Sequence, residues 1–292
     1  MITLKNDYLS VDLHPKGAEI HRIIGLKDDL NYMWRRDPIQ WANSAPILFP
    51  IVGAVRDDTY RVEGKTYHLT QHGFARHNEF EVTSQSDTEV VFTLRSNPDI
   101  LKQYPYLFEL KVTYRLEGST LACLIEVKNV DEKPIVFAVG GHPAFACPFY
   151  ENESSNDYYL EFEQNETLDQ KIIDVAHRAM SHETKKLFDN ERRFFVRQAM
   201  FDEDAVVVKD FKSEWVALRS LNHGKAIVFH MHHFNHLGIW AAKHVGGLIA
   251  IEPWVGHADY NDFTGELKDK EGVVTLDVGD TFQCDFAVEI VQ

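Results

Sequence analysis

Residues 109–128 read ELKVTYRLEGSTLACLIEVK. Apolar and polar side chains alternate through both halves of this stretch, and Gly118-Ser119 interrupts the alternation near its middle. A period of two places alternate side chains on opposite faces of a β-strand. A short turn containing glycine between two such runs predicts a β-hairpin. This stretch therefore favours an antiparallel β protein.

The same pattern recurs along the chain in further two-strand units. They lie at 59–69, 79–95, 214–231 and 273–291, with turns at 63–65, 86–87, 222–224 and 278–280. Residues 1–11 also alternate, which predicts a first strand and not a signal peptide. Helical patterning is limited to single turns near 37–42 and 99–104. Strands at this spacing predict a large all-β antiparallel sandwich with few short helices.

One region departs from the alternation. Residues 176–204 are rich in charge, and their apolar residues show no clean period, so we expect an ordered excursion that is part helix and part loop. No Gly/Ser/Pro-rich linker accompanies it. We therefore expect residues 1–292 to form a single domain.

The composition limits the classes of function. The 292 residues include 30 Lys+Arg and 45 Asp+Glu, a net charge of −15, which argues against nucleic acid and anionic membrane surfaces as partners. No apolar run is long enough to cross a bilayer. Three distant cysteines predict neither a disulfide framework nor a Cys-x-x-Cys metal pair. We expect a cytoplasmic protein.

Histidine is frequent near residue 230. His230 and His232 alternate and so share one strand face, where both could point at a metal ion. Gly224 followed after five residues by His-x-His also matches the first half of a cupin metal motif. His236 and Leu237 stand where that motif expects a glutamate. A cupin-like metalloenzyme is therefore one alternative, but we expect no metal to be bound here.

Four segments do not fit plain sandwich strands. They are PILFPIVG at 46–53, HGFAR at 72–76, GGHPAF at 140–145 and AIEPW at 250–254. Prolines exclude 46–53 from a central strand and predict a buried loop crossing a sheet. Pro253 is expected to end ladder pairing directly after Glu252. A carboxylate at that position is either paired or functional, because an unpaired buried charge is costly.

The combination of these segments carries more information than any member. Taken singly, His72 and His142 could be core histidines, and Glu252 could be half of a structural salt bridge. Together, two histidines beside glycine, an isolated carboxylate, arginines and tryptophans match the needs of a sugar pocket. We expect His72, His142 and Glu252 to converge on one cleft.

These segments resemble the aldose 1-epimerase (galactose mutarotase) family, and more closely its LacX-type branch, over almost the whole chain. The resemblance implies a galactose-mutarotase-like antiparallel β-super-sandwich with a shallow sugar cleft, no metal and no cofactor. The expected partner is a small-molecule sugar, a hexose of galactose or glucose type, and the expected assembly is a monomer or homodimer. A phosphorylated sugar is a variant, because Arg76 and a nearby Lys or Arg could bind phosphate.

The resemblance also implies the catalytic roles. His142 matches the general acid that protonates the ring oxygen, and Glu252 matches the general base that removes the proton from the anomeric hydroxyl. His72 matches a second histidine that holds a sugar oxygen. A histidine with a pKa near 6.5 and a glutamate whose pKa is raised by burial would suit this chemistry.

The remaining expectations concern substrate binding. Arg76, Trp240 and Trp254 are expected to bind the sugar. Arg56 lies near the family's substrate arginine, although Ala54 is an alternative for that place. His233 stands where the family usually carries an aspartate for sugar hydroxyls. A histidine supplies no fixed negative acceptor, which supports a non-catalytic or weakly catalytic carbohydrate-binding protein on the same fold as another alternative.

Overall fold

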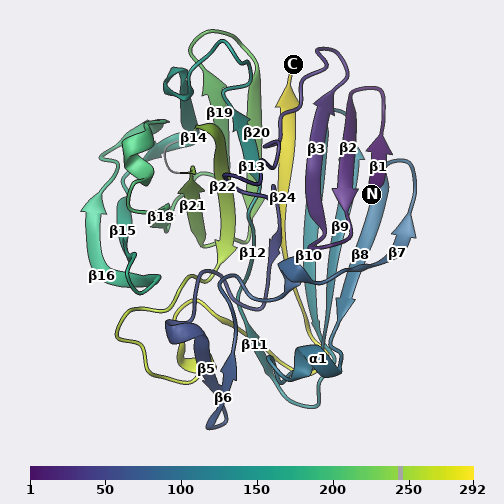
Figure 1. Ribbon diagram of the computed structural model, residues 1–292, viewed down its shortest axis with the longest axis vertical. Helices are drawn as coiled ribbons and strands as arrows, with labels where there is room; N and C mark the ends of the chain where they lie inside the picture. The colour runs from purple at the N-terminus through teal and green to yellow at the C-terminus, as the bar shows by residue number, and fades with distance from the viewer. Residues whose placement is uncertain (243–245) are drawn as a thin grey trace.

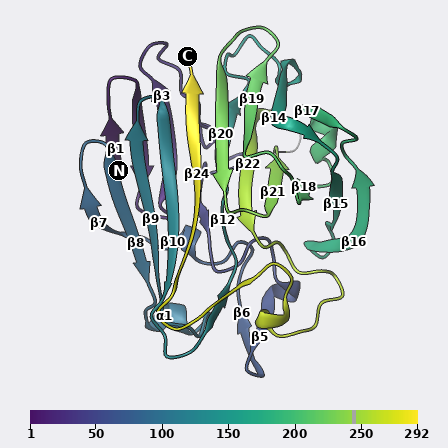
Figure 2. The same cartoon turned by 180° about the vertical axis from the view of Figure 1, so that it is seen from behind.

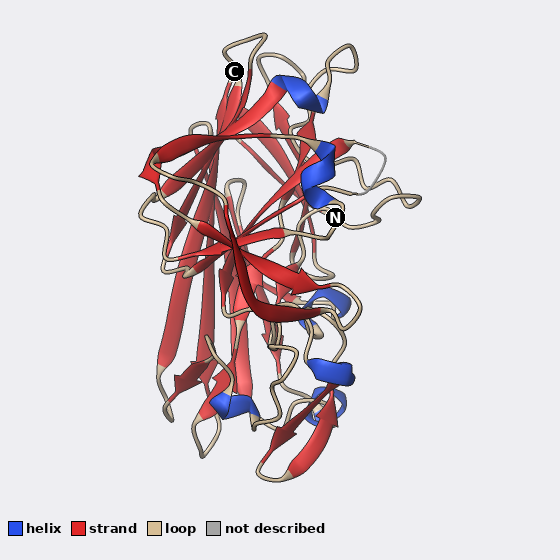
Figure 3. Ribbon diagram, turned by 90° about the vertical axis from the view of Figure 1, so that its left-hand side faces the viewer, coloured by secondary structure: helices blue, strands red, loops and turns tan. Residues whose placement is uncertain are grey.

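The structure is a computed structural model that describes residues 1–242 and 246–292 (Figure 1). Most of these residues lie in β-strands, and every strand pairing between them is antiparallel (Figure 1). Helix is confined to short turns (Figure 3). These are α1 (Pro98–Leu101) and the 3-10 turns η1 (Arg56–Asp58), η2 (Ala75–His77), η3 (Ser155–Asp157), η4 (Gln198–Phe201) and η5 (Leu267–Asp269). The all-β antiparallel prediction is confirmed.

A nine-stranded sheet forms one layer of the molecule, and its long strands lie side by side when it is seen from behind (Figure 2). In spatial order it consists of β17 (Glu191–Phe195), β14 (Tyr158–Glu166), β19 (Trp215–Ser220), β20 (Ala226–His232), β24 (Thr281–Val291), β10 (Thr120–Asn129), β9 (Phe108–Glu117), β8 (Glu89–Arg95) and β7 (Glu81–Gln85).

An eight-stranded sheet and a three-stranded sheet form the second layer (Figure 1). The eight-stranded sheet runs β16 (Ala179–Lys186), β15 (Asp169–Asp174), β18 (Val206–Lys209), β21 (His236–Trp240), β22 (Gly247–Val255), β12 (Val139–Gly141) and β4 (Ile47–Leu48), with β13 (Ala144–Cys147) also paired to β22. The three-stranded sheet contains β1 (Ile2–Lys5), β2 (Leu9–His14) and β3 (Glu19–Gly25). Two small ribbons pair β5 (Thr59–Val62) with β6 (Lys65–His68), and β11 (Ile135–Phe137) with β23 (Val274–Leu276).

The hydrophobic core lies between the two layers. Strand alternation supplies it: along β10 the buried side chains are Leu121, Cys123, Ile125 and Val127, one face of the strand. The front layer contributes side chains such as Ile251 of β22 to the same cluster. Full burial of one such aliphatic side chain stabilises the fold by roughly 1.5–3 kcal/mol.

The predicted hairpins at 59–69, 79–95, 109–128 and 214–231 are confirmed, each with its two strands in antiparallel register. The pairing predicted within 273–291 is wrong. β23 and β24 are both present, but β23 pairs with β11, while β24 lies between β10 and β20. Both edges of β24 are already occupied by long strands, so its sequence neighbour must turn away.

The amino-terminal prediction needs a smaller correction. Residues 1–11 form two strands, β1 and part of β2, and not one. The Asn6 side-chain carbonyl accepts hydrogen bonds from the backbone N–H groups of Tyr8 and Leu9 at 2.8 and 2.9 Å. Such an Asx turn reverses the chain.

Region 176–204 also differs from its prediction. It contains the strands β16 and β17, and helix only in η4. Most side chains of β16 are exposed on both faces, which removes the alternation that would have indicated a strand. The single turns predicted near 37–42 and 99–104 are both present. The first is a turn without a helix, and the second overlaps the four-residue helix α1.

The two proline-containing segments have different outcomes. Segment 46–53 is a largely buried loop that contributes the two-residue edge strand β4, as predicted. Pro253, however, does not end β22, which continues to Val255. The Ile251 N–H donates to the Pro143 carbonyl, so the nitrogen of Pro253, two residues on, faces the same side. There the neighbouring chain changes from β12 to β13, and no N–H is required.

Among the described residues, the helical turns are all too short to cross a membrane.

Candidate active site

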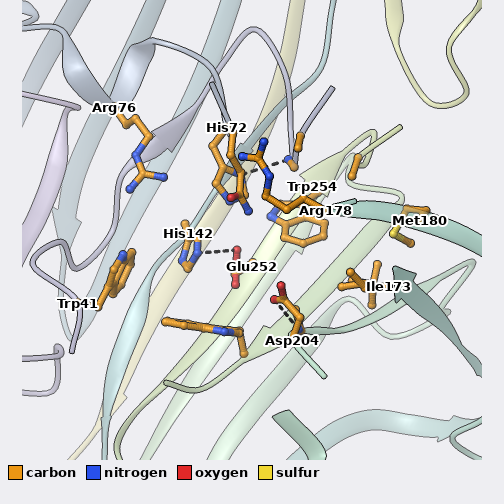
Figure 4. A pocket seen from close by; sticks show the side chains of 17 residues that line it. Trp41, His72, Arg76, His142, Ile173, Arg178, Met180, Asp204, Glu252 and Trp254 are labelled. Atoms are coloured by element: carbon orange, nitrogen blue, oxygen red, sulfur yellow. Dashed lines mark hydrogen bonds and ion pairs between the residues drawn. The ribbon is translucent and has the colours of Figure 1, made fainter. Parts of the chain in front are cut away.

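A cavity of about 360 Å³ lies on the outer face of the eight-stranded sheet (Figure 4). Alternation along β22 explains its position. Ile249 and Ile251 enter the core between the layers, whereas Glu252 and Trp254 line the cavity. One strand therefore serves both the core and the site.

Most of the predicted site residues line this cavity. It brings together His72, Arg76, His142, Trp240, Glu252 and Trp254, and adds Trp41, Gly53, Ala54, Gln71, Ile173, Arg178, Met180, Asp204, Ala205, Val207 and Ala258. The expected convergence of His72, His142 and Glu252 is thus present in the structure.

His142 and Glu252 form a close pair on the floor of the cavity (Figure 4). His142 lies in the gap between β12 and β13, and both of those strands pair with β22, which carries Glu252. Nε2 of His142 is 3.2 Å from Oε2 of Glu252. The two residues are only 8% and 2% exposed. Sheet pairing therefore sets the contact between these two groups.

Burial keeps this pair uncharged. It lowers the pKa of His142 well below its ordinary value, and the nearby His72 and Arg76 lower it further. Burial also raises the pKa of Glu252 well above its ordinary value, aided by the negative charge of Asp204. The expectation that His142 titrates near 6.5 is therefore wrong, whereas the raised pKa of Glu252 is as predicted. Both directions favour the uncharged form of the pair, in which the shared proton is on the Glu252 carboxyl.

Aromatic rings surround the imidazole of His142. The ring of Trp41 lies 4.6 Å from it, centroid to centroid, and that of Trp240 lies 5.8 Å away. The two indoles meet edge-on at 5.6 Å. Trp41 belongs to the turn after Asp37, where no pattern in the sequence indicated a site residue. Such rings exclude water and offer apolar faces to a bound ligand.

His72 presents a fixed hydrogen-bond donor to the cavity. Its Nδ1 accepts the Gly53 N–H at 3.2 Å, so in the neutral ring the proton is on Nε2. Burial lowers the pKa of His72 to about 3, which keeps the ring neutral. The ring lies 5.6 Å from that of His142, edge-on.

Gly73 explains the local path of this segment. It has φ +70°, and a Cβ atom there would lie 2.3 Å from the Phe49 carbonyl oxygen. Only glycine allows this approach. The same oxygen accepts the N–H groups of Phe74 and Ala75, which begins η2 and places Arg76 at the cavity.

Arg56 is not in the site, contrary to the sequence-based expectation. Its side chain is 44% exposed, contacts Asp57 and lines a separate cavity of about 220 Å³. The alternative residue, Ala54, lines the candidate site instead. After Ala54 the chain turns into η1, where Asp57 has φ +54°, so the arginine faces the other way.

His233 is also outside the site. It lies in the turn after β20 with φ +66°, its side chain is 73% exposed, and its Nδ1 is 3.8 Å from the Asp285 carboxylate. The carboxylate inside the cavity is that of Asp204, which the sequence analysis missed. Asp204 directly precedes the buried run that forms β18, a position that could mark a carboxylate at the end of an apolar strand. Because Asp202 and Glu203 are acidic as well, the sequence does not distinguish Asp204 from them.

The hairpin of β15 and β16 adds three residues that sequence reasoning also missed. Ile173, Arg178 and Met180 line the side of the cavity. The guanidinium of Arg178 is 2.9 Å from the Asp58 carboxylate, which links this hairpin to η1. Nothing in the local pattern distinguishes these residues from other surface positions.

The strand histidines do not form the cupin-like centre. His230 and His232 contact different carboxylates of β24, Glu289 at 3.2 Å and Asp285 at 2.8 Å. His236 is on the other sheet, where its ring lies 5.0 Å from that of His257. In residues 1–242 and 246–292, no group of three or more His, Cys, Asp or Glu side chains is placed to hold a metal ion.

Comparisons with known proteins agree with this fold. Protein LacX (chromosomal) of Lactococcus lactis subsp. lactis is 33% identical over 303 residues, covering 99% of each chain. A galactose mutarotase related enzyme from Lactobacillus acidophilus superposes with a TM-score of 0.94 at 30% identity, covering 100% of this chain and 97% of that one. A galactose mutarotase-like protein from Lactobacillus casei gives a TM-score of 0.94 at 32% identity, covering 100% of both chains.

The fold is thus the galactose-mutarotase-like β-super-sandwich that the sequence resemblance implied. A sequence model of the aldose 1-epimerase family matches residues 1–272. The chain therefore belongs to the aldose 1-epimerase family.

Proposed function

We propose that the protein is an aldose 1-epimerase that interconverts the α and β anomers of a hexose. The observation that carries this proposal is the buried contact of 3.2 Å between His142 Nε2 and Glu252 Oε2 on the cavity floor. Anomer interconversion needs one acid at the ring oxygen O5 and one base at the anomeric oxygen O1. This pair holds one proton and can supply both.

The proton transfers of this reaction balance between the pair and the sugar. In the reactive form of the pair, the imidazolium of His142 faces O5 and the carboxylate of Glu252 faces the O1 hydroxyl. His142 gives its proton to O5 as the C1–O5 bond breaks, and Glu252 takes the O1 proton as the C1–O1 carbonyl forms. The pair is then in the uncharged form that burial favours. Rotation about C1–C2 and reversal of both transfers close the ring as the other anomer.

The remaining residues position the sugar. His72 offers its Nε2–H to a sugar oxygen, as its hydrogen bond from Gly53 requires. The indoles of Trp41 and Trp240 pack beside the acid, and Asp204 supplies a negative acceptor for hydroxyls. The reaction written in this way uses proton transfers alone.

Polarimetry on freshly dissolved α-galactose and α-glucose tests this proposal. The wild-type protein should accelerate mutarotation of at least one sugar. In Glu252→Gln, kcat should fall by about 10²-fold or more with a modest change in KM, because the amide cannot accept a proton. Glu289→Gln, at a carboxylate on the other sheet, should leave the rate unchanged. A Glu252→Gln variant that is as fast as the wild type would make Glu252 a structural residue.

The alternative function is that of a sugar-binding protein without efficient catalysis. Its support was His233 in place of an aspartate, but His233 lies outside the cavity, and Asp204 lies within it. Calorimetric binding of a hexose without any acceleration of mutarotation would favour that alternative.

A further inference from the structure

A second cavity, the one of about 220 Å³ that Arg56 lines, adjoins the candidate active site. Neighbouring residues face the two cavities. Ala54 lines the candidate active site and Val55 the second cavity, and Ala258 and Asp259 divide in the same way. At the second cavity, β5 and the yellow segment that contains η5 lie side by side (Figure 1). The described residues that line the two cavities are all different, so the second cavity is a separate site.

The second cavity is lined by a buried ammonium group that has unused hydrogen-bond donors. Lys270 is 5% exposed, and its Nζ donates to Asp259 Oδ1 at 2.6 Å. An ammonium group carries three N–H donors, and in residues 1–242 and 246–292 no other acceptor lies in hydrogen-bond range of this one. Burial lowers the pKa of Lys270 in spite of Asp259, so the ion pair does not fully compensate the desolvation of the cation. The missing acceptor has to come from the cavity.

Two arginines that line the same cavity also lack a close carboxylate. The guanidinium of Arg61 donates to the Thr264 carbonyl, and among the described residues no carboxylate oxygen lies within 4 Å of it. Arg56 contacts Asp57 at 3.7 Å, but the Asp57 side chain is 77% exposed and compensates a cation weakly. The charged groups of the lining are thus three cations and two carboxylates, in a chain of net charge −15. The second cavity is a local excess of positive charge.

The donors reach this cavity from more than one direction. Buried Lys270 lies at its floor, whereas Arg56 and Arg61 are exposed and lie at its rim. A carboxylate offers two oxygens in one plane, whereas a phosphate group offers at least three around a tetrahedral centre. Val55 and Leu267 add buried apolar walls, beside which charge-assisted hydrogen bonds are stronger than in water. This arrangement favours a phosphate group over a carboxylate.

We propose that the second cavity binds a phosphate group, held by Lys270 at the floor and by Arg56 and Arg61 at the rim. Guanidinium groups bind phosphate through paired N–H bonds, and an ammonium group adds a point charge. The bound group accepts from the free donors of Lys270 and neutralises the excess charge. The inference uses no residue that lines the candidate active site, so it does not depend on the proposed function.

Isothermal titration calorimetry with inorganic phosphate, in chloride buffers of constant ionic strength at pH 8, tests the proposal. We expect the wild-type protein to bind saturably with a Kd of about 1 mM or below. In Arg61→Gln and in Arg56→Gln the affinity should fall by about tenfold or more, because each variant loses a charge-assisted hydrogen bond. Arg61→Lys keeps the charge and should retain part of the affinity.

Two other arginines provide controls. Arg95 of β8 is 50% exposed, like the rim arginines, but it has the carboxylates of Glu81 and Glu109 at 2.9 and 2.7 Å. Arg95→Gln should therefore retain the wild-type affinity. Arg76→Gln should retain it as well, because Arg76 lines the candidate active site and not the second cavity.

Two further ligands identify the chemistry and the source of the phosphate group. Acetate should bind about tenfold more weakly than inorganic phosphate, and equal binding would overturn the assignment to phosphate. Tighter binding of glycerol 3-phosphate than of inorganic phosphate would identify a phosphomonoester as the ligand. The reverse order would identify the free ion.

Three results would overturn the site itself. The first is a wild-type protein that does not bind phosphate saturably. The second is binding that is lost in Arg76→Gln and kept in Arg61→Gln, which would place the phosphate in the candidate active site. The third is an equal loss in Arg61→Gln and Arg95→Gln, which would reduce the effect to long-range attraction.

Discussion

His72 donates from Nε2 because its Nδ1 already accepts a backbone hydrogen bond. The residue has φ +66°, which turns the ring toward Gly53 and the cavity at once. A neutral, oriented imidazole can hold a sugar oxygen without competing for the proton that His142 and Glu252 share. A single backbone contact, the hydrogen bond from the Gly53 N–H, therefore sets the tautomer of His72.

Burial of a neutral His72 should make folding sensitive to acid. Its folded pKa of about 3 lies below the ordinary 6.5, so the unfolded chain binds the extra proton between these values. Stability is therefore lost as the pH falls below 6.5, by roughly 1.4 kcal/mol per pH unit for this group. Urea unfolding at pH 7 and pH 5 should show that His72→Asn reduces the pH-dependent loss by roughly 2 kcal/mol.

Asparagine suits this test because it tolerates positive φ and can accept the Gly53 N–H. His233→Asn is the control, since His233 also has φ +66° but is exposed. An unchanged difference between the two pH values in His72→Asn would show that His72 is not the acid-sensitive group.

Asp204 should influence the base as well as bind sugar. Its charge raises the pKa of Glu252, so Asp204→Asn should lower that pKa. The alkaline limb of the profile of kcat/KM against pH should then move to lower pH, because the pair loses its proton sooner. KM should also rise with the lost acceptor. A variant that changes KM without moving the limb would limit Asp204 to binding; Glu203→Gln, at the exposed neighbour, is the control.

At the scale of elements, glycines decide how β21 and β22 carry their aromatic side chains. Gly238 of β21 lies opposite Glu252, and the ring of Trp254 crosses over it. A Cβ atom at Gly238 would lie 2.7 Å from that ring. The flat wall of the cavity thus depends on a position without a side chain.

Gly238→Ala should displace Trp254. Overpacking of this kind costs about 1–3 kcal/mol in the free energy of unfolding, and a moved indole should raise KM. Urea unfolding and mutarotation kinetics measure the two effects. Gly224→Ala is the control, because its Cβ atom would meet open space at an ordinary φ. Equal behaviour of the two variants would show that Trp254 can move without consequence.

Strands and hairpins could be predicted where the residues that determine them lie within one segment of the sequence. The hairpin at 109–128 combines alternation with a glycine turn, and both signals lie within the segment. The partner of β24 depends on which strand edges are free, which no local pattern records. The predictions for Arg56 and His233 were wrong for a related reason. Arg56 directly precedes Asp57, which has a positive φ, and His233 has a positive φ itself. The direction of a side chain in such a turn does not follow from strand alternation. The segments around His72, His142 and Glu252 were recognised as a combination, and not from their individual patterns.

At the scale of the whole molecule, a buried ion pair joins the loops that close one end of the cavity. Lys270 Nζ is 2.6 Å from Asp259 Oδ1, and both side chains are almost fully buried. Asp259 also accepts the Arg56 N–H at 2.9 Å, and its own N–H donates to the Ala54 carbonyl. Ala54 and its neighbour Gly53 line the cavity, as does Ala258 beside Asp259.

Lys270→Met should destabilise the protein by about 3–5 kcal/mol, because it leaves the Asp259 carboxylate buried without its cation. The double variant with Asp259→Asn should recover part of this loss. Lys268→Met, at an exposed position on η5, should change the free energy of unfolding little. Urea denaturation of the four proteins checks the expectation, and a Lys270→Met variant as stable as the wild type would contradict it.

Because β22 carries Glu252, the proposed base, on one face and core side chains on the other, its length matters as much as its composition. Inserting or deleting one residue between Gly247 and Glu252 would reverse every later position on the strand. Ile251 would then enter the cavity, and a carboxyl group would enter the apolar layer. A turn such as Gly118-Ser119 has no such constraint. New specificities can therefore arise by exchanging side chains on β22 or by lengthening the loops around the cavity, but not by changing the spacing along that strand.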